Sequence, residues 1–212
     1  MDQFDLPLPR PVSVRPEEFL VGPSNARAVH MIEHWGAWPV MTALLTGPRK
    51  SGRSLLARLF VAESGGGMID DADRASETEL FHAWNRAQAE RRPLLLVADA
   101  PPPDWAVRLP DLRTRLAASP ILSFDAPDDA LVSDLLRYLF ERRELDARPE
   151  VIAWLHKRLE RTHLAVLRAV ERIEEDADRK RTRRLSVPLV RSALSGGGYI
   201  TELSQSGVRR AG

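Results

Sequence analysis

The sequence predicts an α/β fold, in which a core of parallel strands flanked by helices is followed by a small all-helical domain. Short apolar runs over 40–47, 93–99 and 121–124 alternate with segments of helical periodicity, the pattern of strands joined by crossover helices. A glycine-rich loop separates the first run from the helix after it. Beyond residue 125 only amphipathic helical segments follow, so we expect the sheet to end there.

Each core element carries a local signal. The runs "VMTALLTG" and "PLLLVAD" are predominantly apolar, which is typical of strands buried on both faces. Leu80, Phe81 and Trp84 share one face of a helical segment. We expect strands over 40–47, 93–99 and 121–124, a very short apolar run over 68–71, and helices over 54–61, 77–91 and 109–120.

The second half of the chain predicts four helices. Asp125 and Asp128 flank Pro127, a combination that marks a helix start. The expected helices cover 128–142, 149–160, 162–179 and 187–194. We therefore divide the chain into an extended leader over 1–16, an α/β core over 17–125, a helical lid over 126–195 and a flexible tail over 196–212.

Composition excludes several classes of protein. The chain has 212 residues and no cysteine, which rules out disulfides and fits the cytoplasm. No apolar run approaches the roughly 18 residues that span a bilayer, so we expect no membrane partner. The 31 basic residues are matched by 30 acidic ones, and the basic cluster over 179–184 has no interleaved aromatic residues. A solvated helix end explains that cluster better than direct DNA binding.

The loop "GPRKSGRS" resembles the phosphate-binding pattern G-x-x-x-x-G-K-[ST] and lies between an expected strand and an expected helix. Its backbone N–H groups would cradle phosphate oxygens, and the hydroxyl of Ser54 would hold Mg²⁺. The alternative is a glycine-rich turn with no ligand. The expected cofactor-binding residues here are Gly47, Lys50, Ser51, Gly52, Arg53, Ser54 and Leu55.

One residue departs from this pattern, because Arg53 stands where lysine is expected. Lysine brings a compact point charge to the β- and γ-phosphates, whereas a guanidinium is a wider planar fork. An arginine can still pair with a bound diphosphate. We therefore expect the site to bind ADP, with ATP as a further ligand, and we expect no independent hydrolysis.

"MIDD" ends a short apolar run with two acids, Asp70 and Asp71. After a phosphate loop, such acids hold the Mg²⁺ shell and polarise the attacking water. The alternative is an ordinary turn. Asp99 closes the next strand, where it could sense the γ-phosphate or cap a turn.

The segment "FLVGPSNARA" resembles the start of the nucleotide-binding module of the replication initiator DnaA family, which shares the signature F-x-x-G-x-S-N-x-x-A. Phe19, Gly22, Ser24, Asn25 and Ala28 match it. The resemblance implies an AAA+ module, and it implies that this segment lines an adenine pocket, with Phe19, Val21 and Asn25 as contacts. The alternative is a loop leading into a helix cap.

The stretch from "SETELFHAWN" to "LPDLRTRLAASP" resembles the Hda family of DnaA-related AAA+ regulators. In its last motif, Arg115 matches the arginine finger that the family offers to a neighbour's nucleotide. The segment "RLERTHLAVLRAV" resembles the lid of the same family, which implies that Arg161 touches the bound nucleotide. Relatives place a further strand and helix before "MIDD", so we expect a parallel sheet shortened at its edge.

The leader "QFDLPLP" resembles the Q-x-x-L-x-L peptide with which such proteins dock on the bacterial β sliding clamp. The amide of Gln3 would make a polar contact, and Leu6 and Leu8 would fill apolar pockets. The flanking prolines would keep the peptide extended and lower its ordering cost on binding.

Together the resemblances imply a regulator that docks on the clamp and stimulates ATP hydrolysis by DnaA, touching DNA only through the clamp. This would prevent re-initiation of replication. Two alternatives stay open: a self-contained ATPase or clamp-loader-like factor that uses Ser54, Asp70 and Asp71 with Mg²⁺, and a nucleotide-free adaptor. A homodimer is compatible with each of these.

Overall fold

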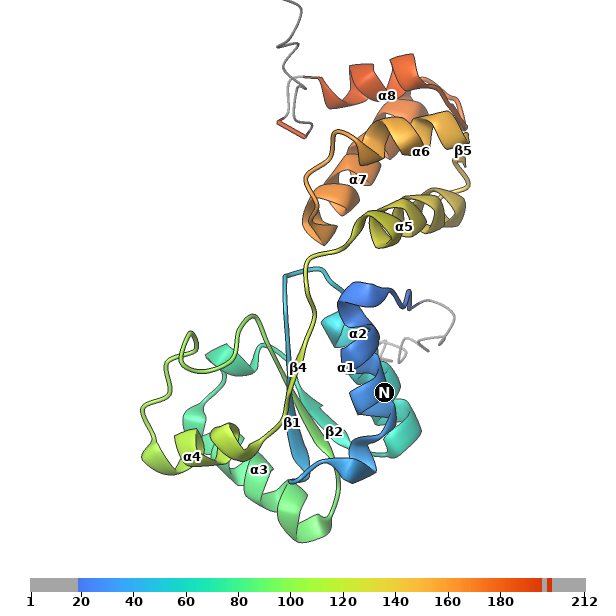
Figure 1. Cartoon of the computed structure of the whole chain (residues 1–212). Helices are drawn as coiled ribbons and strands as arrows, with labels where there is room; N and C mark the ends of the chain where they lie inside the picture. The colour runs from blue at the N-terminus through green and yellow to red at the C-terminus, as the bar shows by residue number, and fades with distance from the viewer. Residues whose placement is uncertain (1–18, 196–197, 200–212) are drawn as a thin grey trace, which may run out of the picture.

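The computed structural model describes residues 19–195, 198 and 199, and it contains a four-stranded parallel sheet flanked by helices (Figure 1). The strand order is β2-β3-β1-β4. The predicted α/β fold class is confirmed. The strands are β1 (Thr42–Thr46), β2 (Gly67–Ile69), β3 (Leu94–Ala98) and β4 (Ile121–Ser123).

Two pairs of helices cover the two faces of this sheet (Figure 1). α1 (Pro23–Glu33) and α2 (Arg53–Ser64) lie on one face, and α3 (Glu77–Glu90) and α4 (Pro110–Ala118) lie on the other. Side chains alternate along each strand, so Ala43 and Leu45 pack toward α1 and α2 while Leu44 packs toward α3 and α4. Burial on both faces explains why β1 and β3 are predominantly apolar in sequence.

The order of the strands places the phosphate loop at the middle of the sheet. β1 pairs with β3 on one side and with β4 on the other, and both pairings are parallel. The chain leaves β1 through the loop 47–52 and enters α2. Crevices that bind ligands in open α/β sheets form at such a point, outside the carboxyl ends of the central strands.

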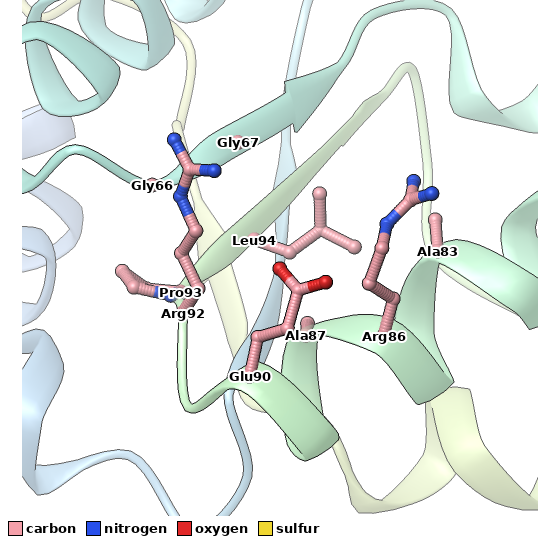
Figure 2. A pocket seen from close by; sticks show the side chains of 9 residues that line it. All are labelled: Gly66, Gly67, Ala83, Arg86, Ala87, Glu90, Arg92, Pro93 and Leu94. Carbon is pink, nitrogen blue, oxygen red and sulfur yellow. The ribbon is translucent and has the colours of Figure 1, made fainter.

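The sheet is short at the edge formed by β2, as the sequence predicts. Only Gly65 and Gly66 separate α2 from β2, and a Cβ at Gly66 would lie 2.4 Å from the carbonyl oxygen of Pro93. Between residues 19 and 195, β3 is the one strand that pairs with β2. A hollow remains there, flanked by Arg86 and Arg92 with Glu90 between them (Figure 2).

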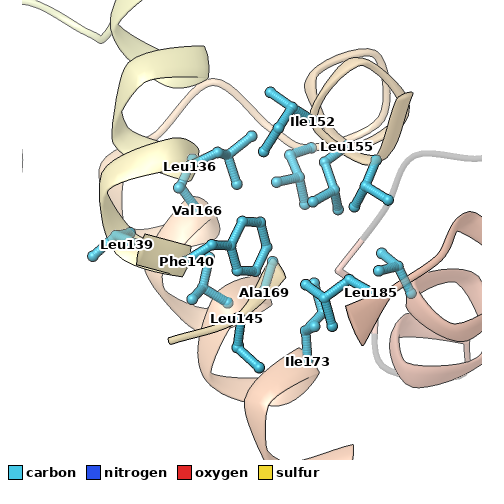
Figure 3. Packing of buried hydrophobic residues seen from close by; sticks show 14 of the residues in the cluster. Leu136, Leu139, Phe140, Leu145, Ile152, Leu155, Val166, Ala169, Ile173 and Leu185 are labelled. Carbon is cyan, nitrogen blue, oxygen red and sulfur yellow. The ribbon is translucent and has the colours of Figure 1, made fainter. Parts of the chain in front are cut away.

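The lid follows as a separate hydrophobic cluster, built from α5 (Asp129–Arg142), α6 (Pro149–His156), α7 (His163–Arg179) and α8 (Val187–Leu194). Phe140, Leu155 and Ile173 are fully buried at its centre (Figure 3). The lid is not purely helical, because β5 (Asp146–Ala147) pairs in parallel with β6 (Arg184–Leu185). α6 also ends four residues before the predicted limit of 160, where the backbone turns toward α7.

A short extended segment links the core to the lid (Figure 1). The carboxylate of Asp128 accepts a hydrogen bond from the Leu131 amide at 2.8 Å and caps α5, as the Asp-Pro signal predicts. Within the described part of the chain, no helix combines the length and the apolar character that a bilayer span needs. The expected leader contacts Gln3, Leu6 and Leu8, and the tail beyond 199, lie outside the described residues.

Candidate nucleotide site

A pocket of about 160 Å³ lies where the phosphate loop, the segment before α1 and the lid meet. It brings together six of the predicted contacts from two parts of the sequence, namely Phe19, Asn25, Lys50, Ser51, Gly52 and Leu55. The predicted contacts Val21, Gly47, Arg53, Ser54 and Arg161 do not line it. The core and the lid both contribute walls, so a ligand here would touch both bodies.

Asn25 fixes the segment that precedes α1. Its Oδ1 accepts a hydrogen bond from the Gly22 amide at 2.8 Å, and its Nδ2 donates to the Leu20 carbonyl at 2.9 Å. Asn25 is 4% exposed, so these bonds are shielded from water. They hold Phe19 and Leu20 against the pocket, whereas Val21 turns outward and is 59% exposed. Leu20 therefore takes the place that the sequence assigned to Val21.

The loop depends on glycine at two positions. Gly47 has φ of 145°, and a Cβ there would lie 2.7 Å from Cβ of Phe124. Gly52 has φ of 92°, and a Cβ there would lie 3.2 Å from the Phe19 ring. The loop backbone therefore approaches both neighbours more closely than a larger residue allows. Ser51 is 6% exposed, and its Oγ has no hydrogen-bond partner among the described residues.

Arg53 turns away from the loop toward the end of β3. Its guanidinium donates to the carbonyl of Ala98 and to Oδ1 of Asp99, the latter at 2.8 Å. Arg49 also donates to Asp99, at 3.0 Å. These hydrogen bonds, that of Arg53 above all, hold the pKa of the Asp99 carboxyl below its usual value. Arg53 thus serves as an internal counter-ion for Asp99, and its charge does not face the pocket.

The predicted metal ligands Asp70 and Asp71 directly follow β2, and Ser54 lies in the first turn of α2. Asp70 and Asp71 are both exposed, and the Asp71 amide donates to Oδ1 of Asp70 at 3.1 Å. Oδ1 of Asp71 lies 3.8 Å from Nη2 of Arg49. Arg49 therefore approaches both Asp71 and Asp99, the acids that follow β2 and β3. That Ser54, Asp70 and Asp71 bind Mg²⁺ stays a prediction.

The lid wall of the pocket is a stripe along α5 with one residue of α7. Leu131, Leu135, Tyr138 and Arg142 follow each other at helical spacing, and Arg142 donates to the Tyr138 hydroxyl at 3.0 Å. His163 begins α7 and is 6% exposed. Sequence reasoning missed all five residues, although the regular spacing along α5 was visible as a second apolar stripe.

Burial lowers the pKa of His163, because an imidazolium would lose its hydration. Its Nδ1 has no hydrogen-bond partner among the described residues. Arg161, which the resemblance places against a nucleotide, is outside the pocket, and its Nε pairs with Asp129 at 2.7 Å. The reason is local: Arg161 precedes the helix cap Thr162, so its side chain reaches the start of α5.

Arg115 lies on α4, packed against α3. Its Nε donates to Oδ1 of Asn85 at 3.0 Å, and its Nη1 donates to the carbonyl of Asp111 at 3.2 Å. The guanidinium carbon also lies 4.5 Å from the ring centroid of Phe81 and 5.3 Å from that of Trp84. The side chain is half-buried, and among the described residues Nη2 has no acceptor. The guanidinium is therefore held in place, while the N–H groups of Nη2 make no hydrogen bond to the described residues.

Comparisons with known proteins bear on the fold. No protein-family model matches the chain. An "Uncharacterized protein" of Haemophilus influenzae is 28% identical over 120 residues, which cover 56% of this chain and 52% of that protein. The chain thus spans about half the length of this curated relative.

Among solved structures, domain III of the Thermotoga maritima replication initiation protein DnaA superposes with a TM-score of 0.71 at 16% identity, over 85% of this chain and 97% of that domain. The chain has the fold of a DnaA-type AAA+ module. A replication initiator DnaA bound to AMPPCP and single-stranded DNA matches with a TM-score of 0.58 at 15% identity, over 80% of this chain and 69% of that one. At such identities the likeness establishes the fold alone, because one fold hosts many unrelated functions.

Proposed function

We propose that this DnaA-type AAA+ module binds an adenine nucleotide, ADP above all, between core and lid without hydrolysing it. The pocket beside the phosphate loop supports nucleotide binding. The absence of hydrolysis follows from Arg53, whose guanidinium is hydrogen-bonded to Ala98 and Asp99. Phe19, Leu20 and Leu135 supply apolar walls for a base. The N-terminus of α2 and the loop amides supply donors for phosphate oxygens. The DnaA bound to AMPPCP adds a precedent in the same fold.

Hydrolysis needs further groups that the site does not bring to the pocket. No lysine follows Gly52, and the two acids after β2 are engaged with Arg49 and with each other. A bound nucleotide would therefore act structurally, by joining core and lid at a fixed angle.

The nucleotide part of the proposal is tested on the isolated chain. Equilibrium binding of labelled ADP should give one nucleotide per chain, and phosphate release from ATP should stay at background. Leu135→Ala, which opens the lid wall, should weaken ADP binding by about tenfold or more, the equivalent of roughly 1.4 kcal/mol. Leu167→Ala serves as the control, because Leu167 packs on the lid cluster and does not line the pocket. Sustained ATP turnover by the isolated chain would overturn the proposal.

We further propose that the chemistry of this protein takes place on another subunit. In this Hda-like role, the chain presents Arg115 to ATP held by DnaA and so promotes hydrolysis in trans. Support comes from the way the guanidinium is held by Asn85, Phe81 and Trp84 while keeping unused donors. A guanidinium fixed in advance stabilises the charge on a transferring phosphoryl group without losing side-chain entropy at that moment.

Docking on the β sliding clamp through Gln3, Leu6 and Leu8 belongs to the same proposal, and it rests on the sequence of the leader. Replacing Gln3 and Leu6 by alanine should abolish binding to the clamp in a surface-immobilised assay. If the variant binds the clamp with the same affinity as the wild type, the proposed docking role is wrong.

A nucleotide-free adaptor is the second candidate, because Asp99 already neutralises the charge of Arg53 within the chain. In that case ADP would leave the thermal midpoint unchanged. A rise on adding ADP would count against the adaptor.

A further inference from the structure

Three metal-binding side chains lie at the C-terminal end of α1. His30, Glu33 and His34 each offer one ligand atom, and these atoms lie within 4.8 Å of one another. All three residues are exposed, so an ion can reach them from solvent. Within residues 19–195, 198 and 199, no other group of three or more histidine, aspartate or glutamate side chains comes as close.

The helix itself produces this grouping. Residues three and four positions apart lie on the same face of an α-helix, so His30, Glu33 and His34 meet over a single turn. The two imidazole rings have centroids 4.2 Å apart, with planes inclined by 41°. Two rings held this close can supply nitrogen atoms to one ion.

A hydrogen bond prepares His34 as a ligand. Its Nδ1 lies 2.8 Å from the carbonyl oxygen of His30, which can only accept, so Nδ1 carries the hydrogen. Nε2 then keeps its lone pair. Histidines that bind metals usually donate their other ring N–H to a carbonyl or carboxylate in this way. The carbonyl groups at a helix C-terminus also carry partial negative charge, which favours a cation there.

We propose that His30, Glu33 and His34 bind one divalent transition-metal ion of the zinc type. Two imidazoles and one carboxylate are a zinc ligand set that leaves the fourth tetrahedral position to water. Zinc–nitrogen distances of about 2.0–2.1 Å require ligand atoms somewhat closer together than the observed limit. Rotation of exposed side chains closes that gap at little cost.

This site is separate from the nucleotide pocket. Asn25, which lines the pocket, and His34, the C-cap of α1, are nine residues apart, roughly 13 Å at the helical rise of about 1.5 Å per residue. Zinc binding therefore does not depend on the proposed nucleotide site, and the two can be tested independently.

The test is a calorimetric titration of zinc into the full chain in a buffer that does not chelate metal. We expect one ion per chain, and His34→Ala should lower the affinity by about tenfold or more, since even the loss of an outer partner costs about 10–100-fold. Glu33→Gln keeps the shape of the side chain and should also weaken binding. His82→Ala is the matched control, because His82 is an exposed histidine of α3 outside the group.

A second readout uses Trp35, the residue after His34. Copper added at one equivalent should quench tryptophan fluorescence in the wild type and in His82→Ala, and should quench it much less in His34→Ala. Circular dichroism of each variant should match the wild type, because the changed side chains are exposed. Absence of a one-to-one zinc isotherm in the wild type, or equal affinity in His34→Ala, would overturn the proposal.

Discussion

Replacing Arg53 by lysine restores the residue that the phosphate-loop pattern requires, and the structure defines what the change removes. The Arg53 side chain is 10% exposed and donates from two nitrogens, to the Ala98 carbonyl and to Asp99. A hydrogen bond to a charged group contributes about 1.5–3 kcal/mol. Lysine can keep one of the two bonds. Asp99 is 35% exposed and retains Arg49, so solvent screening reduces the loss. We expect Arg53→Lys to lower the free energy of unfolding by about 1–2 kcal/mol.

The assay is urea unfolding followed by circular dichroism, with Arg58→Lys as the control. Arg58 is exposed on the same helix, and its replacement should change stability by less than about 0.5 kcal/mol. For a chain of this size, the loss in Arg53→Lys corresponds to a drop of about 2–8 °C in Tm. Equal stability of the two lysine variants would refute the assignment of Arg53 as a buried partner of Asp99.

Arg53→Lys should also change the affinity for ATP. An ammonium at position 53 reaches the loop as a point charge and is less completely tied to β3. One new charge-assisted hydrogen bond to a phosphate, worth about 1.5–3 kcal/mol, should tighten ATP binding by about tenfold or more. Fluorescence titration with a labelled nucleotide measures this change. Weaker binding in Arg53→Lys would show that Arg53 itself holds the phosphates.

Three further variants probe the pocket and the lid. Burial lowers the pKa of His163, so the folded state loses stability as the pH falls below the ordinary imidazole pKa of about 6.5. In thermal scans, the Tm of His163→Gln should therefore fall less than the Tm of the wild type between about pH 7.5 and pH 5.5. Equal falls in Tm would contradict this. Asn25→Ala removes two shielded hydrogen bonds and should cost about 1–3 kcal/mol in urea unfolding; no loss would mean that the turn holds without them. Phe140→Ala should cost about 3–5 kcal/mol at the lid centre, against under about 0.5 kcal/mol for the exposed control Arg137→Ala.

Much of the core could be predicted because its pattern is local. β1 and β3 are buried on both faces, so they appear in the sequence as predominantly apolar runs, the first ending at Gly47 and the second starting after Pro93. The pairing of β5 with β6 could not be predicted, because two residues carry no periodicity and their contact is set by how the lid helices pack.

The pocket residues also fall into two groups, those that a local motif predicts and those that it does not. Phe19, Asn25 and the loop residues were found because each lies in a short contiguous motif. The α5 stripe and His163 were not, because their role depends on the angle between lid and core, which no local pattern encodes. The hydrogen bonds of Arg53 could not be predicted either. Their acceptors at the end of β3 lie near Arg53 only because β1 pairs with β3.

The most direct test of the proposed function is hydrolysis of ATP bound to DnaA, measured in the presence of clamp loaded on DNA. Wild-type protein and Arg113→Ala, which changes an exposed arginine on the same helix, should raise the rate. Arg115→Ala should abolish that stimulation while it still binds the clamp. If Arg115→Ala stimulates hydrolysis as well as the wild type, the central claim of an arginine acting in trans is wrong.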